Sequence, residues 1–125
     1  MTTQDSQTIL IVDDDKMYAN ILQSILEDEG YKVSKAENGI QGLSTIVSVR
    51  PDLVLMDFEM PGMDGLEVIK WVKEQQSLTN IPFIMLTGHS DSETVKGAIA
   101  SGAVDFIVKP VERESLIKKL SSHLN

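Results

Sequence analysis

The stretch LVLMDFEMPGMDG, residues 53–65, contains a short apolar run that leads directly into an acidic residue, Asp57. A continuous apolar run of this length is typical of a strand that is covered on both faces of a sheet. A second acid, Glu59, follows two positions later, and a Pro-Gly pair then indicates a loop. A buried strand that ends on a carboxylate needs a physical reason, which has to come from the rest of the chain.

Apolar runs of this kind recur along the chain, and helical patterns separate them. The expected strands are residues 8–12, 32–36, 53–56, 82–86 and 106–108. The apolar residues at helical spacing are Met17, Ile21, Leu22, Ile25 and Leu26; Ile40, Leu43, Ile46 and Val47; Leu66, Ile69 and Val72; Val95, Ala98 and Ile99; and Leu116, Ile117, Leu120 and Leu124. Gly30 occupies the position of a C-terminal helix cap. Five strands that alternate with five helices predict an α/β fold, in which helices cover both faces of a doubly wound parallel sheet.

Length and composition limit the class of protein. The 125 residues predict one domain, which we expect over residues 8–125 after a flexible N-terminal tail at residues 1–7. The absence of cysteine excludes disulfides, thiolate metal sites and cysteine nucleophiles. No apolar run is long enough to span a membrane, and the polar N-terminus does not resemble a secretory signal. We therefore expect a cytoplasmic protein that does not associate with a membrane.

The chain carries a net charge of −8, from 11 basic and 19 acidic residues. This balance disfavours direct binding to nucleic acid, because the phosphate backbone attracts clusters of Lys and Arg. An acidic surface keeps a protein soluble without any further role. The acids become informative only where the fold gathers them.

Polar residues follow the expected strands, and in open parallel sheets ligands bind beyond the carboxyl ends of the strands. These residues are Asp13, Asp14 and Asp15 after the first strand, Asp57 after the third, Thr87 and Gly88 after the fourth, and Lys109 and Pro110 after the fifth. Two carboxylates about 5 Å apart repel each other by roughly 3 kcal/mol at an effective dielectric constant of about 20. One acid must therefore hold a proton, or a cation must lie among them. Oxygen ligands alone favour Mg²⁺, and nothing resembles a calcium loop.

A carboxylate beside such an ion can act as a nucleophile and form an aspartyl phosphate. Asp57 is the candidate for this role. Lys109 would supply a cation for the phosphoryl oxygens, and Thr87 would supply a hydroxyl donor. Gly88 would leave space and a backbone N–H group.

Four segments that carry these residues occur in an order typical of one family: DDD at 13–15, MDFEMPGMDG at 56–65, LTG at 86–88 and VDFIVKP at 104–110. Over residues 8–124 the chain resembles a CheY-like response-regulator receiver domain of two-component signalling. The resemblance implies the strand order 2-1-3-4-5 and a phosphorelay switch. Such a switch accepts a phosphoryl group from a sensor histidine kinase or a histidine phosphotransfer protein.

The resemblance also implies a role for each site residue. Asp57 would be the phosphoacceptor, and Thr87 and Lys109 would hold the phosphoryl oxygens. The ligands of Mg²⁺ would be Asp13, Asp14, Asp57 and the backbone carbonyl of Glu59. The Lys109–Pro110 bond would be cis, and Phe106 would follow Thr87 in the switch. The fourth helix, fifth strand and fifth helix would form the surface that binds a downstream target, and this surface could also form a homodimer.

Some residues have a simpler structural interpretation or depart from the family pattern. Asp15 precedes the first helix and suits an N-cap, which we favour over metal binding. Glu59 and His89 occupy the two positions that tune loss of the phosphoryl group, so its lifetime stays open. Phe106 lacks the hydroxyl of the commoner tyrosine and would have to act by packing alone. His123 is expected to be solvated.

Three rival functions remain open. A phosphatase of the haloacid-dehalogenase type also forms an aspartyl phosphate, but its second Asp is replaced by Glu59 here. A flavin carrier on this fold would bind the phosphate of FMN in the loop after the first strand. Here that loop is DDDK, residues 13–16, and its acids would repel the phosphate. A receiver used only for docking is the third rival. We expect no enzyme beyond self-catalysed phosphotransfer and dephosphorylation, and we expect the target or output domain to lie outside this chain.

Overall fold

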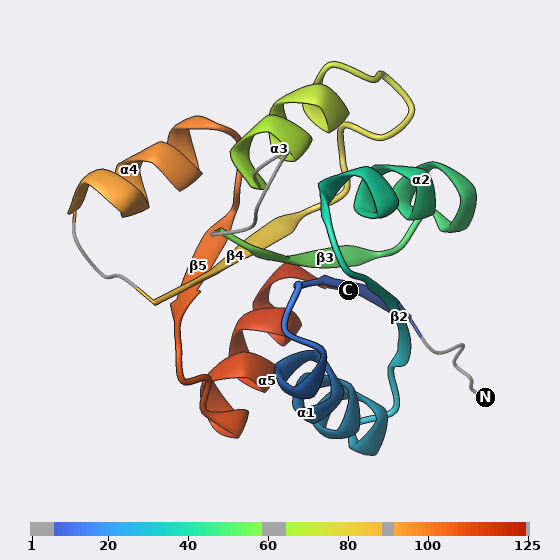
Figure 1. Ribbon diagram of the computed structural model, residues 1–125, viewed down its shortest axis with the longest axis vertical. Helices are drawn as coiled ribbons and strands as arrows, with labels where there is room; N and C mark the ends of the chain where they lie inside the picture. Colours follow the sequence, from blue (N-terminus) through green and yellow to red (C-terminus); the bar gives the residue numbers. More distant parts are fainter. Residues whose placement is uncertain (1–6, 59–64, 89–91, 125) are drawn as a thin grey trace.

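Strands and helices alternate along the chain in a computed structural model, which describes residues 7–58, 65–88 and 92–124 (Figure 1). The strands of these residues are β1 (Thr8–Val12), β2 (Lys32–Ala36), β3 (Leu53–Asp57), β4 (Phe83–Thr87) and β5 (Asp105–Val108). The helices are α1 (Lys16–Asp28), α2 (Gly39–Val49), α3 (Gly65–Lys73), α4 (Ser92–Ala100) and α5 (Arg113–His123). The carbonyl of Gln7 accepts a hydrogen bond from the Lys32 N–H at 2.9 Å, so the first ladder begins at residue 7.

The strands form one sheet in the order β2-β1-β3-β4-β5, and every pairing is parallel. Both the fold class and the strand order are therefore confirmed. The strand ends differ slightly from the sequence prediction. Asp57 and Thr87 are the last residues of β3 and β4 and do not follow these strands, and β5 begins one residue earlier, at Asp105.

Two layers of helices cover the sheet (Figure 1). Helices α1 and α5 lie on one face, and α2, α3 and α4 lie on the other. The core of the first face contains Ile9, Ile11, Leu22, Leu26, Leu55, Ile84, Leu116 and Leu120. The core of the second contains Leu10, Val12, Ile46, Val54, Met56, Val68, Ile69, Val72, Phe83 and Met85. Alternate residues of the central strands enter opposite cores, which is why these strands are apolar throughout.

The buried face of α1 differs from the one that the sequence predicts. Ala19, Leu22 and Leu26 are buried, whereas Met17 is 75% exposed and Ile21 is 51% exposed. Residues 19, 22 and 26 follow the three- and four-residue spacing of a helix face. Met17 and Ile21 project from the opposite, solvent-facing side of the helix, so their inclusion in the core-facing stripe was wrong.

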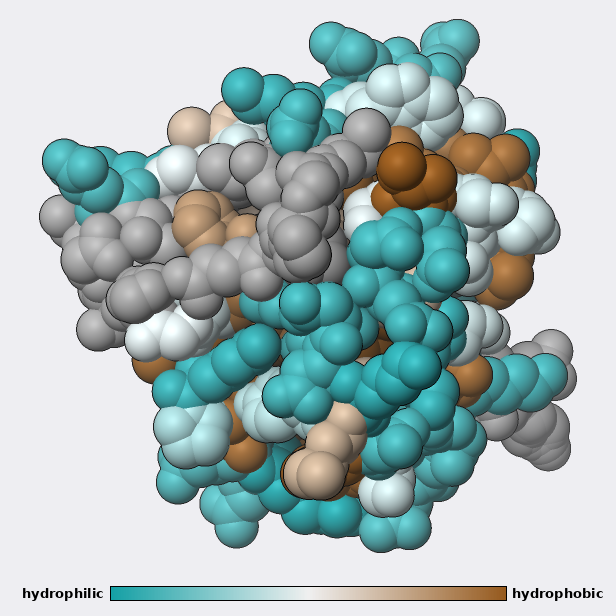
Figure 2. Space-filling model, in the orientation of Figure 1, coloured by the Kyte–Doolittle hydropathy of each residue, from teal (hydrophilic) through white to brown (hydrophobic). Residues whose placement is uncertain are grey.

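Helix α2 shows the same kind of difference. Ile46 is buried as predicted, but Ile40 is 70% exposed and Val47 is 50% exposed. Small residues, Gly39 and Gly42, take the buried positions instead, because α2 packs close to β1. Hydrophobic atoms accordingly reach the surface in the region of α2 (Figure 2).

Both ends of α1 have side-chain or backbone caps. Asp15 Oδ1 accepts a hydrogen bond from the Tyr18 N–H at 3.1 Å, which confirms the predicted N-cap. At the other end, Gly30 has a φ of +95°, and its N–H donates to the Glu27 carbonyl. The Tyr31 N–H donates to the Leu26 carbonyl, which completes a Schellman motif and confirms the cap at Gly30.

Gly65 lets the start of α3 approach β3 closely. A Cβ atom built at this position would lie 2.9 Å from Met56 Cγ and from Met85 Cε, and 3.0 Å from the Asp57 carbonyl oxygen. A glycine is therefore needed directly beside the end of the strand that carries Asp57. Within the described ranges, the model contains no helix with the length and apolar character that a membrane crossing requires.

Candidate functional site

The register of the sheet gathers the polar strand ends at one edge. Val12 pairs with Met56 across β1 and β3, so the next residues, Asp13 and Asp57, are neighbours. Asp57 pairs with Leu86, and Thr87 pairs with Val108, which brings Thr87 and Lys109 to the same edge. Two further backbone bonds extend the ladders here, from Asp13 N–H to the Ala36 carbonyl at 3.1 Å and from Lys109 N–H to the Thr87 carbonyl at 2.7 Å.

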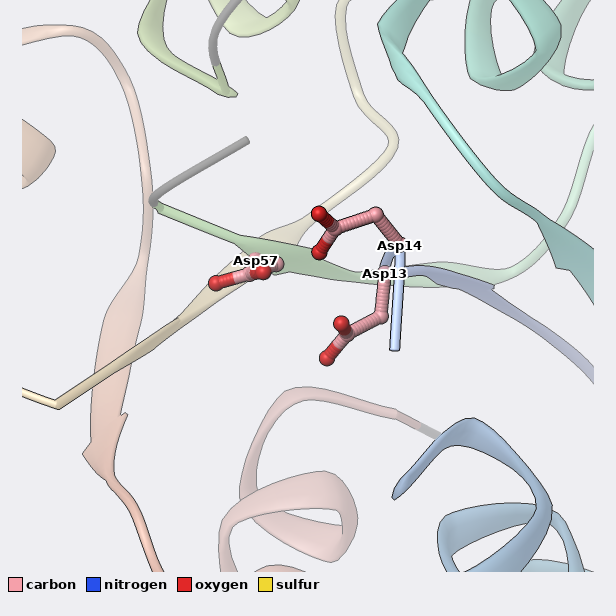
Figure 3. Close-up of side chains that lie close together, drawn as sticks. All are labelled: Asp13, Asp14 and Asp57. Atoms are coloured by element: carbon pink, nitrogen blue, oxygen red, sulfur yellow. The ribbon is translucent and has the colours of Figure 1, made fainter. Parts of the chain in front are cut away.

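Asp13, Asp14 and Asp57 form a carboxylate cluster at this edge (Figure 3). One oxygen of each lies within 4.8 Å of the others. Asp13 and Asp57 are almost fully buried, at 1% and 3% exposure, whereas Asp14 is exposed. The side chain of Asp14 points toward Asp57 in Figure 3. A hydrogen bond within the loop after β1 also fixes the Asp13 side chain, because its Oδ1 accepts the Asp15 N–H at 2.9 Å.

Lys109 is the cationic partner of the two buried acids. Its Nζ lies 3.3 Å from Asp13 Oδ2 and 3.4 Å from Asp57 Oδ1. Burial lowers the pKa of Lys109, but the attraction of Asp57 and Asp13 outweighs it, and the net pKa is raised. The lysine therefore stays charged between them. The Lys109–Pro110 peptide bond is cis, as the resemblance implied.

The donor set of the cluster fits a hard divalent cation. Its three carboxylates contribute three negative charges, and Lys109 returns one positive charge. Because all the candidate ligand atoms are oxygens and one of the acids is exposed, an ion could bind while keeping several of its waters. These are the binding conditions that Mg²⁺ prefers.

Thr87 lies at the tip of β4 beside this cluster and is 1% exposed. Its register partner Val108 directly precedes Lys109. Asp57 and Thr87 end adjacent strands of the sheet, so both side chains lie at this edge. Glu59 and His89 fall outside the described residues, so their predicted tuning roles, and the carbonyl ligand at Glu59, stay predictions.

Tyr18 is a member of the site that the sequence prediction missed. Its ring centroid lies 4.9 Å from Lys109 Nζ, and its hydroxyl accepts the Val111 N–H at 2.9 Å. Burial raises the pKa of Tyr18, although the Val111 bond and Lys109 oppose the shift. The only signal in the sequence was an aromatic residue three positions after the N-cap Asp15, which is too weak to identify a partner of Lys109.

Phe106 is half-buried in the core on the side of α2 and α3. Lys119 Nζ lies 5.7 Å from the Phe106 ring and 2.9 Å from Asp105 Oδ1. His123 Nε2 lies 3.2 Å from the other oxygen of Asp105. The prediction that His123 is simply solvated was therefore wrong, because the acid at the start of β5 attracts it to the sheet edge.

Comparisons with known proteins agree with this geometry. A family model described as "Response regulator receiver domain" matches residues 9–121. The DNA-binding response regulator MtrA of Mycolicibacterium paratuberculosis is 36% identical over 118 residues, which cover 94% of this chain and 51% of MtrA. The chain thus spans about half the length of that curated relative.

Two solved structures show how closely the backbone follows this family. The Vibrio cholerae chemotaxis protein CheY4 is 33% identical, with a TM-score of 0.90 over 95% of this chain and 99% of that protein. The signal receiver domain of a histidine kinase from Syntrophus aciditrophicus is 38% identical, with a TM-score of 0.88 over 95% of this chain and 90% of that one. MtrA, CheY4 and the histidine kinase are different kinds of protein, so what this chain shares with all three is the receiver domain.

Proposed function

The chain belongs to the response-regulator receiver domain family, and we propose that it is a Mg²⁺-dependent phosphorylation switch in which Asp57 accepts the phosphoryl group. The observation that carries this proposal is the set of three carboxylates with Lys109 on Asp13 and Asp57. This set combines a nucleophile, a cation site and a fixed positive charge at one sheet edge.

The proposed donor is a phosphohistidine on a sensor kinase or a phosphotransfer protein. An oxygen of Asp57 forms a bond to phosphorus while the P–N bond breaks. The electron pair of that bond returns to the imidazole, which takes up one proton and leaves neutral. Lys109 and Thr87 stabilise the charge that develops on the phosphoryl oxygens. Asp13, Asp14 and Asp57 would hold a bound Mg²⁺, which would neutralise part of the negative charge on those oxygens.

The proposed output surface consists of α4, β5 and α5. It exposes apolar side chains, since Ile99 of α4 is 47% exposed and Val108 of β5 is 36% exposed. A hollow of about 230 Å³ between β5 and α5 is lined by Phe106, Val108, Pro110 and Lys119, among others. A movement of Thr87 toward the phosphoryl group would vacate space for Phe106 and reshape this surface. This is a population shift driven by a local change of charge.

The haloacid-dehalogenase alternative predicts repeated turnover of phosphomonoesters, whereas we propose that the chain acts only on itself. Intact-protein mass spectrometry tests the proposed function, and a phosphate-release assay tests the alternative. Incubation with Mg²⁺ and acetyl phosphate should add one phosphoryl mass, and chelation by EDTA should prevent the addition. Asp57→Asn should gain no mass, with Asp52→Asn as the matched exposed control that still does. A modified Asp57→Asn protein would contradict the assignment, and sustained phosphate release from a phosphomonoester would favour the phosphatase.

A further inference from the structure

Tyr18 connects α1 to both sides of the Lys109–Pro110 bond. Its ring lies against the ammonium group of Lys109, with 4.9 Å from Nζ to the ring centroid. Its hydroxyl accepts the backbone N–H of Val111 at 2.9 Å. One side chain therefore contacts the lysine and the backbone two residues later. A lysine nitrogen within about 6 Å of an aromatic face is attracted by the ring.

Lys109 has two kinds of partner, the carboxylates of Asp13 and Asp57 and the ring of Tyr18, and phosphorylation would affect only the carboxylates directly. Asp13 and Asp57 both belong to the carboxylate cluster, so a divalent cation would compete with Lys109 for the same two carboxylates. Asp57 would in addition use an oxygen to bind phosphorus. The ring of Tyr18 is neutral and offers no carboxylate oxygen to a metal. Its attraction for Lys109 therefore persists when the two acids turn to other partners.

We propose that Tyr18 is a positioning residue that keeps Lys109 directed at Asp57 while the carboxylates bind the metal and the phosphoryl group. This inference rests on the proposed function of Asp57. Without the ring, the repulsion of a divalent cation and the flexibility of the lysine stem would let the ammonium group move toward solvent, since the Lys109 side chain is already 25% exposed. The ammonium group of Lys109 would then have to return to the site before it could stabilise the phosphoryl oxygens, and phosphorylation would be slower.

A purely structural role for Tyr18 makes a different prediction. Tyr18 is half-buried and packs against the core between the sheet and the α1–α5 layer. If packing alone mattered, a leucine would serve as well as the ring. Tyr31 provides a matched control, because it packs against the same core. It directly precedes β2 and so lies at the amino ends of the strands, away from the site.

The test compares Tyr18→Leu, Tyr18→Phe and Tyr31→Leu with the wild-type chain. Phosphoryl gain from acetyl phosphate is followed by intact mass at saturating Mg²⁺, and Mg²⁺ affinity is measured by titration calorimetry. We expect Tyr18→Leu to react about fivefold more slowly, which corresponds to about 1 kcal/mol of transition-state stabilisation. Tyr18→Phe, which keeps the ring, and Tyr31→Leu should react at nearly the wild-type rate. Mg²⁺ affinity should not fall in any of the three variants.

Each contrary result has a distinct meaning. Equal rates for Tyr18→Leu and the wild type would overturn the positioning role and leave the proposed function intact. A parallel loss of rate and Mg²⁺ affinity in Tyr18→Leu would also overturn it, because it would indicate general damage to the site. If Tyr18→Leu does not show a cooperative thermal transition, Tyr18→Met replaces it with the same expectations. A wild-type protein that gains no phosphoryl mass would refute the proposed function, and this inference with it.

Discussion

The Nζ atom of Lys109 lies 3.4 Å from Asp57 Oδ1, although one residue ends β3 and the other follows β5. The same nitrogen lies 3.3 Å from Asp13, so one ammonium group serves two buried carboxylates. The site therefore retains an excess of negative charge, which a divalent cation can neutralise.

The first prediction concerns Asp13→Asn. In the absence of divalent ions this substitution should raise the free energy of unfolding by about 1 kcal/mol, because it removes repulsion at the cluster while Asp57 still pairs with Lys109.

The wild type should gain about 2.7 kcal/mol from Mg²⁺ at 100 times its dissociation constant, and Asp13→Asn should gain much less at the same concentration. Urea denaturation with EDTA or with MgCl₂ measures both effects. Exposed Glu74→Gln is the control, and equal Mg²⁺ stabilisation of Asp13→Asn would contradict the metal site.

The second prediction separates phosphorylation from the conformational change. Thr87→Ala removes a hydroxyl that we expect to bond a phosphoryl oxygen, a contact of about 1.5 kcal/mol, and should slow phosphorylation roughly tenfold. It should also abolish the change in the NMR signals of the Phe106 ring on phosphorylation. Thr87→Ser, which restores the hydroxyl, should recover both. A Phe106 response in Thr87→Ala as large as in the wild type would show that the ring does not depend on this hydroxyl.

The third prediction compares two glycine substitutions. Gly65→Ala should lower the free energy of unfolding by about 2 kcal/mol, because the added Cβ meets the Asp57 carbonyl as well as two methionine side chains. Gly42→Ala meets only Val12 methyl groups, at 3.1 Å and 3.3 Å, which can adjust more easily. Its effect should be smaller in the same urea experiment. A larger loss for Gly42→Ala would mean that the close approach at β3 is unimportant.

The fourth prediction is a pH dependence at β5. Burial raises the pKa of Asp105, but hydrogen bonds from Lys119, the Phe106 N–H and His123 outweigh this and lower it below the ordinary value of 3.8. A lowered folded-state pKa contributes stability that is present above the unfolded pKa and is lost as the pH falls through the folded one.

Asp105→Asn should therefore be less stable than the wild type at pH 7, and the difference should shrink below about pH 4. Urea denaturation at pH 7, 5, 4 and 3 provides the measurement. Glu114→Gln on the exposed surface of α5 is the control for loss of a carboxylate in this part of the chain. A difference between Asp105→Asn and the wild type that stays constant down to pH 3 would show that the carboxylate makes no favourable pairing.

The fold could be predicted from the sequence because the central strands are long apolar runs and a polar residue ends or directly follows each of them. That pattern alone predicts that Asp13, Asp57 and Thr87 lie at one edge of the sheet. The buried face of α1 was assigned less well, since Met17 and Ile21 have the hydropathy of core residues but lie on the exposed surface. Hydropathy alone does not define the rotation of a helix about its axis, which depends on packing against the sheet.

Two contacts that helix residues make with the chain around β5 could not be predicted from sequence patterns. Tyr18 reaches Lys109 only because the loop after β5 passes over the first turn of α1. His123 reaches Asp105 because α5 returns along the edge strand β5. Neither pairing leaves a periodic signal, because the partners lie far apart in the chain and each depends on the packing of a whole layer.

The most direct test of the central claim is the position of the phosphoryl group. After incubation with acetyl phosphate and Mg²⁺, borohydride reduction converts an aspartyl phosphate to homoserine, which peptide sequencing by mass spectrometry can locate. The account predicts homoserine at position 57 and at no other acid of the cluster. Homoserine at position 13 or 14, or none in a protein that has gained phosphoryl mass, would contradict it.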